Sequence, residues 1–227
     1  MPIGRTRNRP PTRRRCAGIE TVLVTSKHLS PAATADRERC HRITTLARQL
    51  DLKEGYPPDH ATAVVANARA MADALSLAED VRLTLDLGAE LHDLGKLCIR
   101  DSVLAKPTAL TEEEWDVMRI HPEAGAWLFM SLVGSPEVAA IIRFHHERWD
   151  GSGYPSRLAG EAIPLAARIV AVADAYQAMV EPRPYRQAFS HTVALERLHA
   201  GSGTQFDPAC VDALSRALQT TRTPRAG

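Results

Sequence analysis

Apolar residues recur every three to four positions along most of the chain, which is the period of an amphipathic α-helix. Helix starts are marked by a capping box of Thr111 with Glu114, by Ser135 before Pro136, and by Asp207 before Pro208. The pattern predicts helices over residues 60–75, 81–92, 111–121, 135–145, 164–179 and 207–218. Alternation typical of a strand is limited to residues 21–25. We therefore expect a compact all-α bundle, in which the Gly-rich segment 147–160 forms a rim loop.

Composition sets the class of protein. The 227 residues carry a net charge of +1 and 44% are apolar, which suits one globular domain and gives no sign of nucleic-acid binding. No run of about 18 apolar residues predicts a membrane span. Four cysteines without C-x-x-C spacing fit a cytoplasmic protein without disulfides.

The ends of the chain differ from its middle. Six of the first fifteen residues are arginine, interleaved with proline, a composition that cannot build a packed core. Residues 1–35 are thus expected to form a disordered basic tail, and the alternative is an arm that touches an acidic partner or nucleic acid. Residues 36–220 would be the folded domain, followed by a flexible end at 221–227.

Histidines and carboxylates at inward-facing positions are candidate metal ligands. The set is His60, His92, Asp93, His121, His145, His146 and Asp174. Seven donors suffice for two ions, and imidazole with carboxylate suits iron, manganese or zinc. The absence of cysteine from the set argues against a structural zinc site. A carboxylate beside a histidine, as in His92 with Asp93, could bridge two ions that share one water, which indicates hydrolysis.

Each candidate ligand has a structural alternative. His92 and His145 end apolar stripes and could be core histidines that bond to a carbonyl. Asp174 lies in an apolar helix and could pair with Arg168 or Lys96. His60 could be a residue at a helix start, and His121 before Pro122 could cap the next helix.

Two motifs resemble those of a known family. The segment from His92 to Lys96 reads H-D-L-G-K and resembles the H-D-x-G-K signature of the HD superfamily of metal-dependent phosphohydrolases. The run that starts at His145 and ends in Gly153, Tyr154 and Pro155 resembles the signature of its HD-GYP branch. The resemblance covers roughly residues 46–218. It implies an all-helical catalytic domain that hydrolyses the bacterial messenger cyclic di-GMP to linear pGpG, often onward to GMP, with iron or manganese.

The resemblance also implies residue roles. His60, His92, Asp93 and Asp174 would hold one metal, and Asp93 would bridge to a second held by His121, His145 and His146. Lys96 and Arg183 would bind phosphate, and Asp93 with Lys96 would act in catalysis. Gly153, Tyr154 and Pro155 would contact the substrate, with Tyr154 or Trp149 stacking on a guanine, or would dock a diguanylate cyclase.

Two positions depart from the family pattern. Tyr56 stands where some members carry the glutamate of a third metal site, so two ions are expected. Gln177 stands where members tend to carry an aspartate, which puts substrate positioning by Lys96 in doubt. A cyclic di-GMP receptor or adaptor with little turnover, and a phosphohydrolase for other nucleotides, are therefore the alternatives. The sequence is also compatible with a homodimer.

Overall fold

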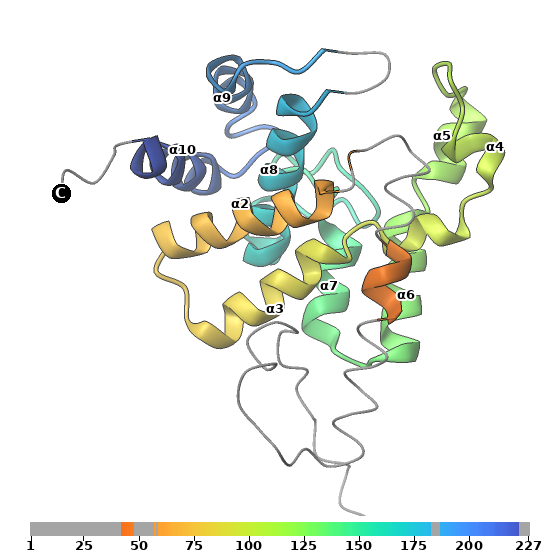
Figure 1. Ribbon diagram of the computed structural model, residues 1–227. Helices are drawn as coiled ribbons and strands as arrows, with labels where there is room; N and C mark the ends of the chain where they lie inside the picture. The colour runs from red at the N-terminus through yellow and green to blue at the C-terminus, as the bar shows by residue number, and fades with distance from the viewer. Residues whose placement is uncertain (1–41, 48–56, 58, 183–186, 223–227) are drawn as a thin grey trace, which may run out of the picture.

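The computed structural model describes residues 42–47, 57, 59–182 and 187–222, and these residues are helical with loops and contain no strand (Figure 1). A short helical stretch at 42–47 comes first. The named elements that follow are α2 (His60–Ala74), α3 (Glu79–Glu90), η2 (Leu94–Cys98), α4 (Asp101–Leu104), α5 (Glu112–Met118), α6 (His121–Leu132), α7 (Pro136–Phe144), η3 (Gly160–Ala162), α8 (Leu165–Val180), α9 (His191–Ala200) and α10 (Pro208–Arg222). The expected all-α fold is confirmed.

Local capping explains where several helices begin. Thr111 accepts a hydrogen bond from the backbone of Glu114, whose side chain bonds back to the backbone of Thr111, so the predicted capping box is present. Ser135 accepts from the backbone N–H of Val138 at the start of α7. These bonds satisfy N–H groups that have no partner within the helix.

One predicted boundary was wrong. The sequence pattern continued a single helix from 111 to 121, but α5 ends at Met118 and His121 is the first residue of α6. Pro122 lies in the first turn of α6, where a missing N–H costs nothing, so it starts a helix here and does not end one. This places His121 at a helix N-terminus, which sets the direction of its side chain.

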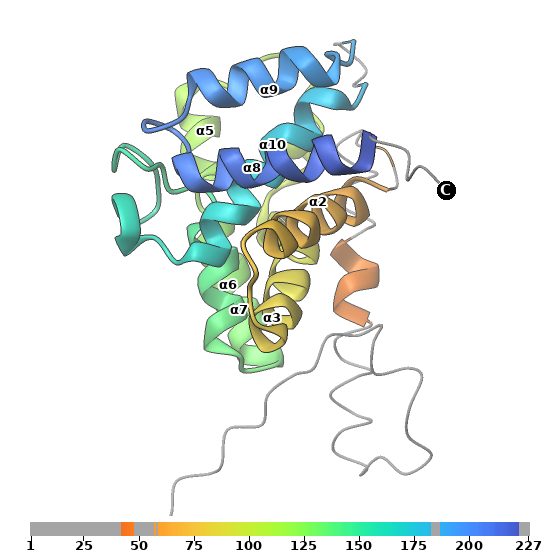
Figure 2. The ribbon, with the colours of Figure 1, turned by 90° about the vertical axis from the view of Figure 1, so that its left-hand side faces the viewer.

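The two largest apolar clusters among the described residues hold the bundle together. The larger one is shared by α2, α3, α8 and α10 and includes Met71, Leu85 and Leu214. The smaller one joins α3, α6 and α7 with the stretch at 42–47, around Phe129 and Ile142. Figure 2 shows α9 at the top, α10 crossing α8 and lying over α2, and α3, α6 and α7 below. Because α3 and α7 also pack against α8, the side chains between the two clusters come from distant parts of the sequence.

Some expectations concern residues outside the described ones. Residues 1–35, the possible strand at 21–25, Tyr56, Arg183 and the last residues 223–227 fall there. Among the helices that the structure does describe, none has the length and apolar character needed to cross a membrane.

Candidate metal centre

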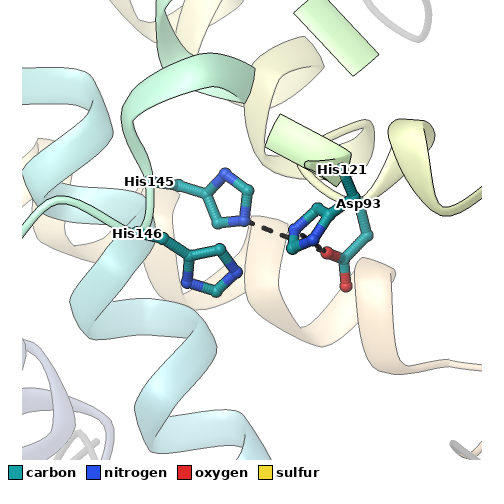
Figure 3. A group of neighbouring side chains, drawn as sticks. All are labelled: Asp93, His121, His145 and His146. Atoms are coloured by element: carbon teal, nitrogen blue, oxygen red, sulfur yellow. Dashed lines mark ion pairs between the residues drawn. The ribbon is translucent and has the colours of Figure 1, made fainter. Parts of the chain in front are cut away.

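Two neighbouring groups of donor side chains lie between the apolar clusters. The His60 group contains His60, His92 and Asp174, and the His121 group contains Asp93, His121, His145 and His146. Within each group the ligand atoms lie within 4.8 Å of one another. Figure 3 shows His145 and His146 extending from one segment toward His121 and Asp93. All seven residues that the sequence nominated are thus brought together, and their role as metal ligands is a prediction that the geometry makes possible.

Asp93 lies between the two groups. Its Oδ1 is 3.3 Å from Nε2 of His121, and its Oδ2 is 3.4 Å from Nε2 of His92. In the His60 group, Oδ1 of Asp174 is 3.4 Å from Nε2 of His60. Each oxygen of Asp93 therefore faces a different donor group, as a bridging carboxylate would.

Five separate elements supply these residues. His60 and His121 are the first residues of α2 and α6, His145 follows the end of α7, and Asp174 lies within α8. His92 and Asp93 occupy the turn between α3 and η2. Helix ends suit this task, because a side chain at a terminus can point along the axis into the space between packed helices.

Three histidines share one hydrogen-bonding pattern. Nδ1–H of His92, His121 and His145 donates to the backbone carbonyl three residues earlier, at 2.7, 2.8 and 2.8 Å. The structural alternative of a core histidine bonded to a carbonyl therefore describes only one nitrogen of each ring. Among the described residues, Nε2 of these three rings is buried and has no hydrogen-bond partner. A buried nitrogen left in this way costs about 1–3 kcal/mol, which a bound cation would offset. The donors thus fit a metal.

The carboxylates of the centre are ionised. Burial alone would raise the pKa of Asp93, but the charges of Lys96 and His92 outweigh it and hold that pKa well below its usual range. Burial is likewise outweighed at Asp174, where the nearby His60 ring and the charge of His92 lower the pKa to about 2. Both side chains are therefore available as anionic ligands at neutral pH.

The histidines divide into two electrostatic classes. Burial and neighbouring histidines lower the pKa of His145 well below its usual value, and burial lowers that of His146 to about 3. These two rings are neutral, as a ligand must be. In the His60 group, burial is outweighed: Asp93 raises the pKa of His92 to about 10, and Asp174 raises that of His60. A metal that binds the His60 group would have to displace protons.

Nearby cations decide between the alternatives for Asp174. Arg168 pairs with Asp207 at 2.6 Å, and Lys96 pairs with Asp93 at 2.8 Å. Asp174 instead faces His60 and His92. Arg168 is therefore not the partner of Asp174. Arg183, the second predicted phosphate ligand, lies outside the described residues.

The Gly-rich loop packs directly on the histidine segment. A Cβ on Gly153 would lie 2.3 Å from the backbone N of Arg148, so only glycine allows the loop to approach this closely. Tyr154, joined to Pro155 by a cis peptide bond, stacks on His146 with ring centroids 4.9 Å apart. One face of the Tyr154 ring is therefore already used to position His146, and substrate contact by Gly153, Tyr154 and Pro155 stays a prediction.

Two buried glutamates were missed by reasoning from the sequence. Glu147 accepts hydrogen bonds from the backbone N–H of Ser156 at 2.6 Å and of Leu158 at 3.1 Å, and so anchors the rim loop. Glu181 accepts one from Nδ1–H of His60 at 2.7 Å. The partner of Glu181 lies 121 residues away in the sequence. The partners of Glu147 are backbone N–H groups, which any loop residue offers, so neither contact could be predicted from residue types.

Comparison with protein families agrees with this geometry. Residues 33–210 match a family described as HD domain. The chain belongs to the HD domain family. It is 43% identical over 209 residues to the cyclic di-GMP phosphodiesterase response regulator RpfG of Xanthomonas campestris pv. campestris. The aligned segment covers 90% of this chain and 53% of RpfG. The predicted resemblance to the HD superfamily is thereby confirmed. The chain spans about half the length of this relative.

Other relatives differ in the substrate that they are named for. The 3'3'-cGAMP-specific phosphodiesterase 2 of Vibrio cholerae is 34% identical over 177 residues, which cover 76% of this chain and 33% of that protein. A crystal structure of a V. cholerae cyclic GMP-AMP specific phosphodiesterase, V-cGAP3, superposes with a TM-score of 0.65 at 24% identity. It covers 81% of this chain and 49% of the other, and shows the shared helical fold.

Proposed function

We propose that this protein is a metal-dependent phosphodiesterase that hydrolyses cyclic di-GMP to linear pGpG. The observation that carries the proposal is the convergence of seven histidine and aspartate donors in two adjoining groups around Asp93. The likeness to RpfG supports cyclic di-GMP as the substrate. Relatives named for cGAMP make a mixed cyclic dinucleotide the second substrate to test.

The side chains of the centre have separable tasks in this proposal. His60, His92 and Asp174 would hold one divalent ion, His121, His145 and His146 a second, and Asp93 would contact both. When bound, such a pair supplies Lewis acidity and makes a water nucleophilic near neutral pH. Lys96 holds its ammonium 2.8 Å from Asp93, where it would bind a phosphoryl oxygen and neutralise the charge that develops there.

The surroundings of Gln177 favour an enzyme over a receptor. An uncharged residue at position 177 could leave Lys96 without a carboxylate to orient it. Lys96 is oriented by Asp93, while Gln177 bonds to Glu181 and Asn67. Gln177 therefore does not deprive the catalytic lysine of an anionic partner.

The proposal also covers the bound metals, the location of the protein and a protein partner. We expect two ions, of iron or manganese, because imidazole and carboxylate suit both metals. Cys98 and Cys210 are free thiols, which supports a cytoplasmic location. Docking of a diguanylate cyclase on the loop at 147–160 stays a prediction.

Product analysis tests the proposal. Protein loaded with Mn²⁺, or with Fe²⁺ under anaerobic conditions, should convert cyclic di-GMP to pGpG. Asp93→Ala and His92→Ala should lower turnover by about 100-fold or more, because each removes a ligand. His199→Ala is the matched control, since His199 is exposed and bonds to Ser215.

Three outcomes would contradict the proposal. Binding of cyclic di-GMP without hydrolysis, under both metals, would make the protein a receptor. Faster hydrolysis of a mixed cyclic dinucleotide or of linear nucleotides would reassign the substrate. Unchanged turnover in Asp93→Ala would remove the site.

A further inference from the structure

His60 is held differently from three other histidines of the centre. His92, His121 and His145 each donate Nδ1–H to a backbone carbonyl of their own turn. His60 donates to a side-chain carboxylate, Oε2 of Glu181, 121 residues away in the sequence and 2.7 Å away in space. Glu181 follows the last residue of α8 and is only 7% exposed. A buried carboxylate carries a desolvation cost, so its placement against one ligand ring needs a reason.

Glu181 is itself held in place by a chain of side chains. Gln177 donates from Nε2 to Oε1 of Glu181 at 2.5 Å, so both oxygens of the carboxylate are bonded. Asn67, two turns after His60 on the same face of α2, donates from Nδ2 to Oε1 of Gln177 at 3.0 Å. The chain Asn67, Gln177, Glu181, His60 therefore starts and ends on α2 and passes through the C-terminal part of α8.

We propose that Glu181 is a positioning residue for His60, and that Gln177 and Asn67 fix Glu181 in turn. The inference rests on the proposed metal-dependent function. A carboxylate that accepts from one imidazole nitrogen fixes the tautomer and the ring orientation and makes the other nitrogen a stronger donor. Nε2 of His60 is thereby directed toward Asp174, 3.4 Å away. The His60 group gains an anionic support that the backbone carbonyls of the His121 group do not supply.

This arrangement explains why an uncharged amide suits position 177. An amide both donates and accepts, so Gln177 can donate to Glu181 while it accepts from Asn67. An ionised carboxylate at this position could only accept and would repel Glu181. Gln177 and Glu181 therefore form a matched pair, one helical turn apart.

Metal affinity is the direct test. Equilibrium dialysis against Mn²⁺, with metal content measured for each protein, gives the affinity of every bound equivalent without substrate. Glu181→Ala should weaken one equivalent by about 10- to 100-fold and leave the other unchanged. Glu181→Gln keeps an oxygen acceptor but loses the charge, so its loss should be smaller. The exposed Glu196→Gln is the matched control and should bind as the unaltered protein does.

A marker variant assigns the two equivalents. His121→Ala removes a donor of the His121 group and should weaken the equivalent that Glu181→Ala leaves intact. Gln177→Ala removes the support of Glu181 but leaves the carboxylates of Glu181 and Asp174 in place. It should weaken the same equivalent as Glu181→Ala does, with a smaller loss of affinity. Because Gln177 is only partly buried, this variant provides the test if Glu181→Ala does not fold.

Turnover supplies an independent measurement. At limiting Mn²⁺, kcat of Glu181→Gln should fall while KM for cyclic di-GMP changes little, and excess Mn²⁺ should restore kcat. Unchanged affinity of both equivalents in Glu181→Gln and Gln177→Ala would overturn the inference, as would equal weakening of both. Normal metal binding without any hydrolysis would overturn the proposed function and leave the inference on Glu181 standing.

Discussion

Substitution of Gly95 should disrupt the candidate metal centre although Gly95 has no side chain to act there. Gly95 lies in η2, against the start of α6. A Cβ at this position would lie 1.8 Å from the carbonyl oxygen of His121 and 2.5 Å from the backbone N of Gly125. A carbon approaches an oxygen to about 3.3 Å at closest, so η2 and α6 would have to separate by about 1.5 Å. Both contact atoms are backbone, and neither can rotate away.

The separation would act on stability and on ligand geometry together. Overpacking typically costs about 1–3 kcal/mol, and we expect about 3 kcal/mol or more for Gly95→Ala because backbone must move. For a domain of this size that corresponds to a decrease in Tm of about 6–12 °C. Since the clashing carbonyl belongs to His121, its ring would move too, and a displacement of about 1 Å can lower a rate by about 100-fold.

Thermal unfolding, Mn²⁺ content and turnover would be measured on the same preparations. Gly201→Ala is the control, because its Cβ would meet the Phe206 ring at 3.0 Å, away from the donors, and a side chain can shift. That variant should keep its metal and its turnover. A Gly95→Ala protein with unchanged Tm, metal content and rate would refute the argument that backbone contact between η2 and α6 places His121.

Three further predictions concern the other supports of the centre. Tyr154→Ala removes the ring that stacks on His146 and should weaken Mn²⁺ binding, while Tyr154→Phe should not; equal affinities by dialysis would contradict this. With its pKa raised to about 10, His92 is protonated at pH 7, so metal binding should release a proton and affinity should rise with pH by about tenfold per unit for each proton released. Calorimetry in buffers of different ionisation enthalpy counts these protons, and a count of zero would disprove the point. Glu147→Ala leaves two backbone N–H groups of the rim loop unbonded and should lower the free energy of unfolding by about 2 kcal/mol or more, measured by urea denaturation; no change would show that the loop is anchored elsewhere.

Helix positions and candidate ligands could be predicted from the sequence because both depend on local properties. A helix with a buried stripe repeats its apolar residues at short spacing, and the capping box at Thr111 involves neighbours in the chain. The seven donors were recognised by residue type and by the resemblance of two motifs. The helix boundary at His121 was missed, because Pro122 permits either a stop or a start and only packing decides which.

The tertiary structure alone decided how the donors are held. Asp93 faces both groups, Glu181 meets His60, and Gly95 lies against the carbonyl of His121 because distant helices pack together. Sequence spacing carries no information about such contacts, since they depend on the relative placement of whole elements. Residue type therefore determined which atoms could bind a metal, and the packing of α2, η2, α6 and α8 determined which of those atoms face one another.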